Sequence, residues 1–99
     1  MVTNSRQLQT LDDLREYVNE TLCQCDQLER GIFQMTERIL VKGGAACGMY
    51  FCLHGPRAVK FSAIWDAQTS SLLFYGASGE RFQKVDLIEA PELNAKAAA

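Results

Sequence analysis

Apolar positions follow a period of three to four up to residue 28 and a period of two from residue 32 onward. At about 100° per residue, the first pattern places its apolar side chains on one stripe of an α-helix, with the acidic residues away from its centre. Thr10 is a suitable N-cap with Asp13 three residues later, and Gly31 is a suitable stop. We therefore expect a helix over residues 10–30, with a stripe of Leu11, Leu14, Val18, Leu22, Cys25 and Leu28.

The alternation that follows is typical of strands separated by short turns. Lys42-Gly43-Gly44 and Gly55-Pro56 are strong turn signals, and polar or glycine-containing runs mark two more turns near residues 66–71 and 76–79. The expected strands are residues 33–41, 46–54, 59–66 and 72–75, with residues 80–87 as a fifth if Phe82, Val85 and Leu87 belong to one.

Connections of this length are too short for parallel crossovers, so the strands should form an antiparallel meander with the helix packed on one face. The predicted fold is α+β: one N-terminal helix on a four-stranded sheet, or a five-stranded one if residues 80–87 are included. This order of elements resembles that of cystatin-like folds, in which one helix packs across an antiparallel sheet. The glycine-centred loop and hairpin motif of cystatins have no counterparts at matching positions, so the resemblance implies no inhibitory residues.

The chain of 99 residues, 47% of them hydrophobic and 22% charged, has the size and balance of a single globular domain. We expect that domain over residues 10–90, with a flexible N-terminus at 1–9 and a flexible tail at 91–99. Neither a secretory signal nor an apolar run long enough to span a bilayer is apparent, which predicts a cytoplasmic protein with no membrane contact. Four cysteines are too few for a disulfide scaffold.

The cysteine spacings do not favour a metal site, and no cofactor is expected. Cys23 and Cys25 are two apart on the predicted helix, so their side chains point about 200° away from each other. Cys47 and Cys52 are five apart on a strand and fall on opposite faces. We expect Cys25, Cys47 and Cys52 to pack as small apolar residues and Cys23 to be exposed and oxidisable.

A thiol enzyme is one hypothesis for the run that ends at His54, the only histidine. Cys52 and His54 share a face, but their Cα atoms would be about 7 Å apart, which strains a direct hydrogen bond. Asp66 is the one acidic group that a neighbouring strand could bring to His54. Because no third group is otherwise evident, the sequence favours a non-catalytic protein and assigns no catalytic residue.

A nucleic-acid or anionic-ligand binder is the alternative hypothesis. Tyr50, Trp65 and Tyr75 could stack on bases, with Arg38, Arg57 and Lys60 to supply charge. Aromatic residues at strand spacing are usually core residues, however, and the isoelectric point of about 5.3 lies far from that of a basic nucleic-acid binder.

The leading hypothesis comes from strands that are apolar on both faces, because one helix covers only one side of a sheet. A three-residue turn at Gly55-Pro56 places the odd positions of the two flanking strands, residues 46–54 and 59–66, on the same side of the sheet. A two-residue turn would place odd positions of one strand beside even positions of the next. With the three-residue turn, the residues expected under the helix are Met49, Phe51, Phe61, Trp65 and Phe74. The uncovered patch is then Leu40, Tyr50, Cys52, Ile64, Leu73 and Tyr75.

Monomers rarely leave such a patch in water. We therefore expect an association module: a homodimer, or a domain that binds a protein partner or a small apolar ligand through this face. The expected binding residues are five from the patch and two at the tip of the adjoining hairpin, namely Tyr50, Cys52, Ile64, Leu73, Tyr75, His54 and Arg57.

Overall fold

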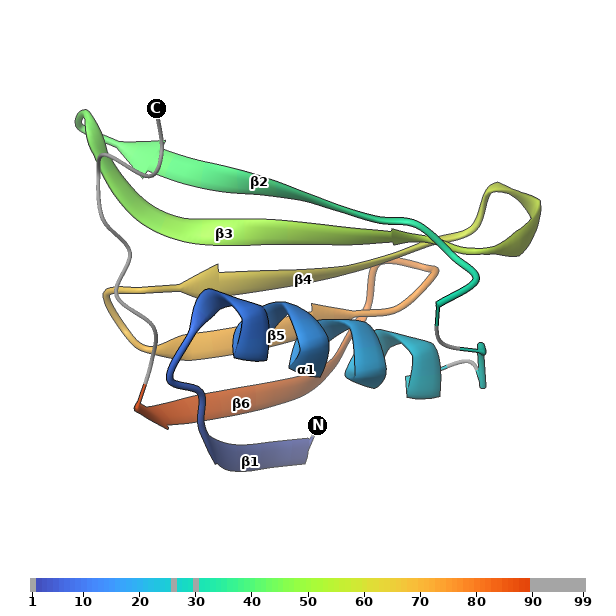
Figure 1. Ribbon diagram of the computed structural model, residues 1–99, viewed down its shortest axis with the longest axis horizontal. Helices are drawn as coiled ribbons and strands as arrows, with labels where there is room; N and C mark the ends of the chain where they lie inside the picture. Colours follow the sequence, from blue (N-terminus) through green and yellow to red (C-terminus); the bar gives the residue numbers. More distant parts are fainter. Residues whose placement is uncertain (1, 26, 30, 90–99) are drawn as a thin grey trace.

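The computed structural model describes the backbone of residues 2–25, 27–29 and 31–89 and the side chains of residues 8–25, 27–29 and 31–87. The elements in order are β1 (Val2–Gln7), α1 (Leu11–Cys25), β2 (Met35–Lys42), β3 (Ala45–His54), a 3-10 turn (Pro56–Ala58), β4 (Lys60–Asp66), β5 (Ser71–Tyr75) and β6 (Arg81–Glu89). The strands form one sheet in the order β1-β6-β5-β4-β3-β2, and α1 lies across one face of it (Figure 1).

The strands β2 to β6 form an antiparallel meander in which each strand pairs with the next along the chain. The predicted α+β fold is therefore confirmed, and the fifth strand exists, since residues 81–89 form β6. Gly43 and Gly44, with φ of 61° and 81°, make the tight β2–β3 turn that only residues tolerant of positive φ adopt readily. The arrangement is compatible with a cystatin-like architecture.

Strand β1 is an addition that the hydrophobic pattern does not indicate. Residues 2–7, expected to be a flexible terminus, pair in parallel with β6, with Val2 opposite Gln83 and Arg6 opposite Leu87. A parallel pair needs a long crossover, and here the crossover is α1 together with the rest of the meander. The predicted tail at 91–99 lies outside the described residues.

Helix α1 begins where the sequence indicates and ends earlier. The Thr10 hydroxyl accepts the Asp13 N–H at 3.0 Å, and the Asp13 carboxylate accepts the Thr10 N–H at 3.3 Å, which confirms the capping box. The helix stops at Cys25 because Gln27 adopts a φ of 54° and the Leu28 N–H donates to the Cys23 carbonyl at 2.7 Å. With the Gln27 N–H donating to the Gln24 carbonyl, this is a Schellman motif with glutamine at its left-handed position.

Replacing Gln27 by glycine is therefore expected to stabilise the domain by about 0.5–1 kcal/mol, because glycine occupies the left-handed region without a Cβ penalty. The measurement is urea unfolding followed by the fluorescence of Trp65, the only tryptophan and only 1% exposed. The matched control is Gln24→Gly inside the helix, which should lose about 1 kcal/mol. A loss of stability in both variants would contradict this account of the helix end.

The early end also corrects the expectation for the two helical cysteines. Cys23, predicted to be exposed, is 2% exposed and belongs to the core, whereas Cys25, predicted to be buried, is exposed. The chain turns back at Gln27 so that Leu28 packs against the core, and the Cys23 thiol donates to the Asn19 side-chain oxygen at 3.5 Å. If the helix continued to residue 30, the chain would not turn back at Gln27.

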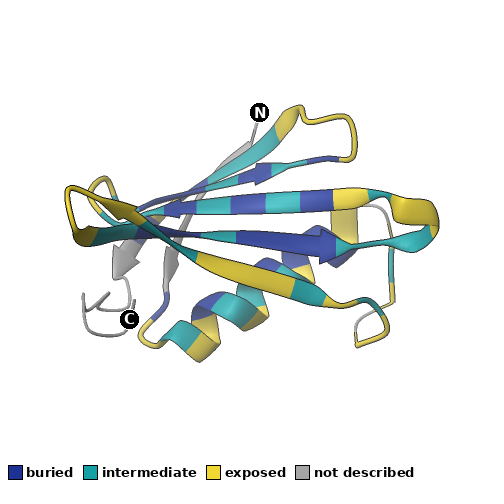
Figure 2. Cartoon of the chain, turned by 90° about the horizontal axis from the view of Figure 1, so that it is seen from above, coloured by how far each residue is buried: buried dark blue, intermediate teal, exposed yellow. Residues whose placement is uncertain are grey.

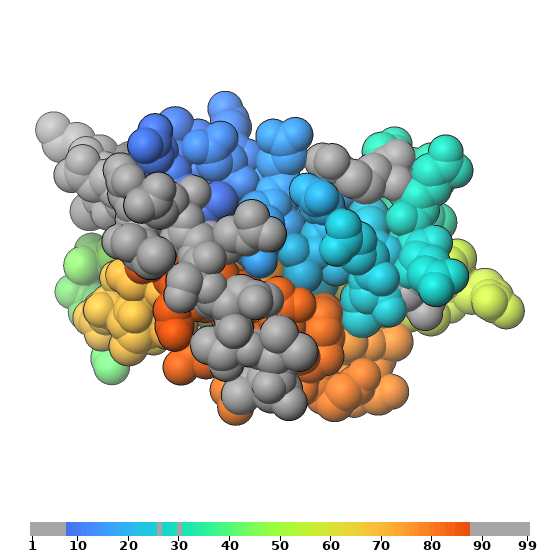
Figure 3. All heavy atoms as spheres, turned by 90° about the horizontal axis from the view of Figure 1, so that it is seen from below, coloured from blue at the N-terminus to red at the C-terminus, as the bar shows by residue number. Residues whose placement is uncertain are grey.

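The core lies between α1 and the sheet. Leu14, Val18 and Leu22 of the helix are fully buried, and Figure 3 shows the atoms of α1 (blue to cyan) against the orange atoms of β5 and β6. His54 pairs with Lys60 across a five-residue connection at 55–59, longer than expected but with the parity that keeps odd with odd. The helix side of the sheet is therefore Met49, Phe51, Leu53, Phe61, Ala63, Trp65, Leu72, Phe74 and Val85.

Candidate interaction surface

The sheet face opposite α1, here called the open face, carries an apolar row across its three central strands. Tyr50 of β3 pairs with Ile64 of β4, and Ile64 pairs with Leu73 of β5. All three side chains are half-buried, whereas those on the other face are nearly all fully buried. In Figure 2, which views the molecule from above with the strands running across the picture, α1 lies on one side of the sheet only.

Further apolar residues lie in the two rows on either side of this one. Cys52 pairs with Ser62, and Ser62 pairs with Tyr75, which places Cys52 and Tyr75 in one adjoining row. Leu40 lies in the row on the other side, opposite Gly48. The structure therefore brings the six patch residues named from the sequence onto one face, where Cys52 is buried, at 6% exposure, and the other five are half-buried.

Charged residues border this patch with both signs present. Arg38 pairs with Tyr50 at one end of the apolar row, and Lys84 pairs with Leu73 at the other. Asp66 and Asp86 lie in the next row, with the Lys84 Nζ 3.8 Å from the nearer Asp86 carboxylate oxygen. An apolar centre with a polar rim of mixed charge is the usual anatomy of a protein interface.

A hollow of about 180 Å³ interrupts the open face beside Leu40 and Ile64. It lies where Gly48 contributes no side chain between Leu40 and Asp66. No larger residue fits at Gly48, because a Cβ there would collide with the carbonyl oxygen of Trp65. The lining residues are Leu40, Lys42, Cys47, Ile64, Trp65, Asp66 and Gln68.

The two hairpin residues of the predicted site, His54 and Arg57, lie at the end of β3 and in the turn that follows it. His54 is the last residue of β3, and its Nε2 is 3.0 Å from the Thr36 hydroxyl. Arg57 lies in the 3-10 turn beyond it, is exposed, and has a left-handed φ of 56°. Neither residue adjoins the apolar row.

The register separates the groups that a thiol enzyme would need. His54 pairs with Lys60 and Asp66 pairs with Gly48, so His54 and Asp66 lie at opposite ends of β3 and β4, about 20 Å apart along the strands. Among the side chains that the structure describes, those of residues 8–25, 27–29 and 31–87, no three histidine, cysteine or carboxylate groups gather as a metal site.

The stacking surface of the nucleic-acid hypothesis is also divided. Trp65 is in the core beneath α1 at 1% exposure, on the opposite side of the sheet from Tyr50 and Tyr75. Its indole N–H is buried and has no hydrogen-bond partner among the described residues, which costs about 1–3 kcal/mol. Trp65 therefore packs as a core side chain and cannot stack on a base.

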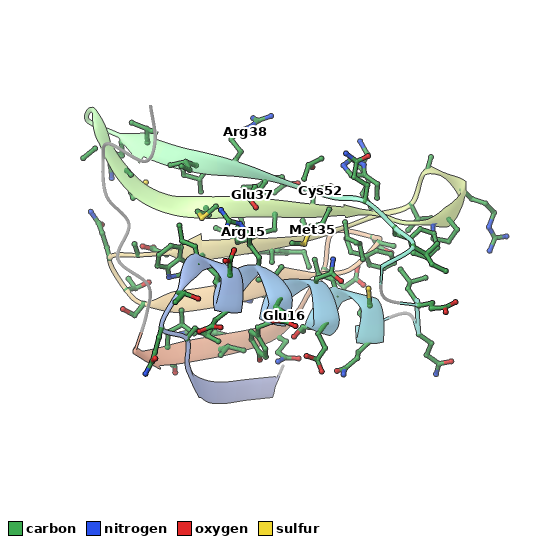
Figure 4. All side chains as sticks on the ribbon, viewed as in Figure 1. Arg15, Glu16, Met35, Glu37, Arg38 and Cys52 are labelled. Atoms are coloured by element: carbon green, nitrogen blue, oxygen red, sulfur yellow. The ribbon has the colours of Figure 1, made fainter. Side chains whose placement is uncertain are left out.

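A second feature, which the sequence does not indicate, is a groove of about 620 Å³ between α1 and β2. Arg15 reaches from the helix to Glu37 of β2, with Nε–Oε1 and Nη2–Oε2 distances of 2.7 and 2.9 Å, and a third bond of 2.9 Å joins it to Asp12 (Figure 4). Hydrogen bonding to Glu37 raises the pKa of Arg15 above its ordinary value. The groove is lined by Asp12, Arg15, Glu16, Asn19, Gly31, Met35 and Glu37.

Comparison of the chain with protein-family models, curated proteins and solved structures finds no match. Within the described part of the chain, no helix has the length and apolarity to cross a membrane. Any assignment of function therefore depends on the geometry of the two surfaces described above.

Proposed function

We propose that this domain is a non-catalytic association module that forms a homodimer through its open face. The observation that carries the proposal is the row Tyr50, Ile64 and Leu73, with Cys52, Tyr75 and Leu40 beside it, on the side of the sheet that α1 does not cover. Apolar surface of this kind gains about 25 cal/mol for each Å² removed from water.

A second copy of the chain is the occupant that the rim favours. The cations Arg38 and Lys84 and the anions Asp66 and Asp86 border one patch, so a two-fold arrangement can oppose unlike charges. The two longer dimensions of the molecule are 36 and 27 Å, which is enough for the roughly 800 Å² that each partner buries in a standard interface. The hollow beside Leu40 offers space for a protruding side chain of the other copy.

Size-exclusion chromatography with light scattering tests this directly. We expect a mass of twice the 11.1 kDa chain at concentrations of about 10–100 µM, falling toward the chain mass on dilution. If the protein is a monomer at about 100 µM but binds a hydrophobic dye, the occupant of the open face would be a protein partner or a small apolar ligand instead of a second copy. A monomer that ignores the dye would contradict association through the open face altogether.

A further inference from the structure

The outer edge of β2 is a second surface, separate from the open face. β2 is the last strand of the sheet, so one side of its backbone has no strand partner among the residues that the structure describes. The His54 N–H donates to the Gln34 carbonyl at 2.8 Å, in register with the β2–β3 ladder. Because bonded and non-bonded pairs alternate in an antiparallel ladder, the even positions of β2 bond inward to β3.

The outward backbone groups therefore belong to Met35, Glu37 and Ile39. The side chains of these residues lie on the helix side, and Met35 and Glu37 line the groove against α1 (Figure 4). The bulge in this ladder leaves the extra residue, Cys47, in β3, so the backbone of β2 remains regular along its outer edge. A segment added to this edge would meet the groove with every second side chain.

The charge of the groove indicates what such a segment should carry. Asp12, Glu16 and Glu37 contribute three carboxylates against the single guanidinium of Arg15, a net charge of −2. Basic side chains therefore suit the side of the added strand that faces the groove.

Exposed apolar side chains mark the two ends of the same edge. Ile32, just before β2, is 63% exposed, and Val41, near its end, is 56% exposed; they are the strongly exposed large hydrophobic residues of the described chain. Val41 belongs to the strand itself, and Ile32 lies in the turn that precedes it. A strand added along the whole of β2 would meet apolar surface at both ends.

Charge placement disfavours a second copy of β2 as that segment. Residues opposite each other in a pair share a face, so a two-fold axis at Glu37 would oppose two glutamates and one at Arg38 would oppose two arginines. Axes at Thr36 and Ile39 avoid opposed like charges, but the second copy would then bring no basic side chain to the groove, because Arg38 and Lys42 lie on the other face of β2.

We propose that the outer edge of β2 and the α1–β2 groove form a docking site for an extended basic segment of a partner protein. The segment adds to the sheet as a seventh strand, bonded to Met35, Glu37 and Ile39, with lysine or arginine side chains entering the groove. This site uses none of the six patch residues of the open face, so it stands independently of the homodimer.

A titration followed by amide NMR tests the site with a defined probe: a ten-residue peptide with valine near each end and lysine at alternate central positions. We expect saturable shifts of the Met35, Glu37 and Ile39 amides, whose N–H groups point outward, and smaller shifts for Thr36 and Arg38. The same peptide with alternate backbone nitrogens methylated should bind at least tenfold more weakly, because it cannot complete the ladder. A glutamate-for-lysine peptide should not bind.

Two glutamates of α1 provide a matched pair of variants. Glu16→Gln removes a carboxylate that lines the groove and should weaken the lysine peptide by about two- to fivefold, whereas Glu20→Gln removes one outside the lining and should have no effect. Equal binding of the lysine and glutamate peptides, shifts confined to Tyr50 and Ile64, or no saturable shifts would each overturn the proposal. Shifts of the same β2 amides on concentrating the protein alone would assign the edge to a second copy instead.

Discussion

Replacing Tyr50 with lysine is expected to leave the protein folded and to abolish the dimer. Tyr50 lies at one end of the apolar row, between Arg38 and Ile64, and is half-buried in the single chain. An ammonium group there would lose its hydration in the interface and would lie beside a second cation. We expect the dissociation constant to rise at least a hundredfold, measured by light scattering or sedimentation equilibrium.

The control for this prediction is Gln24→Lys, which makes the same kind of side chain on the exposed surface of α1. It should dimerise like the unchanged protein. Circular dichroism and Trp65 fluorescence should be native in both variants, because Tyr50 lies outside the core cluster. A Tyr50→Lys protein that still dimerises would show that the open face is not the interface, even if the unchanged chain is a dimer.

Truncating Phe74 to alanine should produce the largest loss of stability. Phe74 is fully buried, and its ring centroid lies 6.1 Å from those of both Tyr17 and Phe82, the first of them in an edge-to-face arrangement at 81°. The truncation removes buried area, leaves a cavity and breaks two aromatic contacts, so we expect a loss of about 3–5 kcal/mol. For a domain of ordinary stability this is a large fraction of the total.

Urea unfolding followed by Trp65 fluorescence is the measurement. Phe74→Leu, which keeps most of the volume, should lose clearly less, and Leu73→Ala on the adjacent position of β5 should also lose less because Leu73 is only half-buried. If Leu73→Ala cost as much as Phe74→Ala in the monomer, the assignment of the two faces would be wrong.

Local signals account for most of what the sequence predicts correctly. The capping box of Thr10 and Asp13, the glycine turn at 43–44 and the alternation in β2 and β4 each depend on neighbours within a few residues. The division between the two sheet faces followed from the parity of the β3–β4 turn. Its length was wrong, but its parity was right, and parity alone decides which side chains lie under α1.

Features that depend on distant partners were not predictable. Residues 2–7 are mostly polar and form a strand only because β6 is there to pair with them. The end of α1 carries glutamine where glycine usually signals a stop, so periodicity suggested a longer helix. Arg15 and Glu37 are 22 positions apart, and nothing in their local sequence indicates that the helix and the edge strand meet there.

The pairing of β1 with β6 joins the two ends of the described chain, since Val2 lies opposite Gln83. The β1–β6 pairing closes a loop of nearly the whole chain, so its loop-closure entropy is the largest in the fold. The strands of the meander pair with their neighbours in sequence and close only short loops. Folding should therefore assemble α1 and β2 to β6 first and admit β1 last. Unfolding should follow the reverse order, so β1 should detach first in a partial opening that leaves the rest of the domain intact.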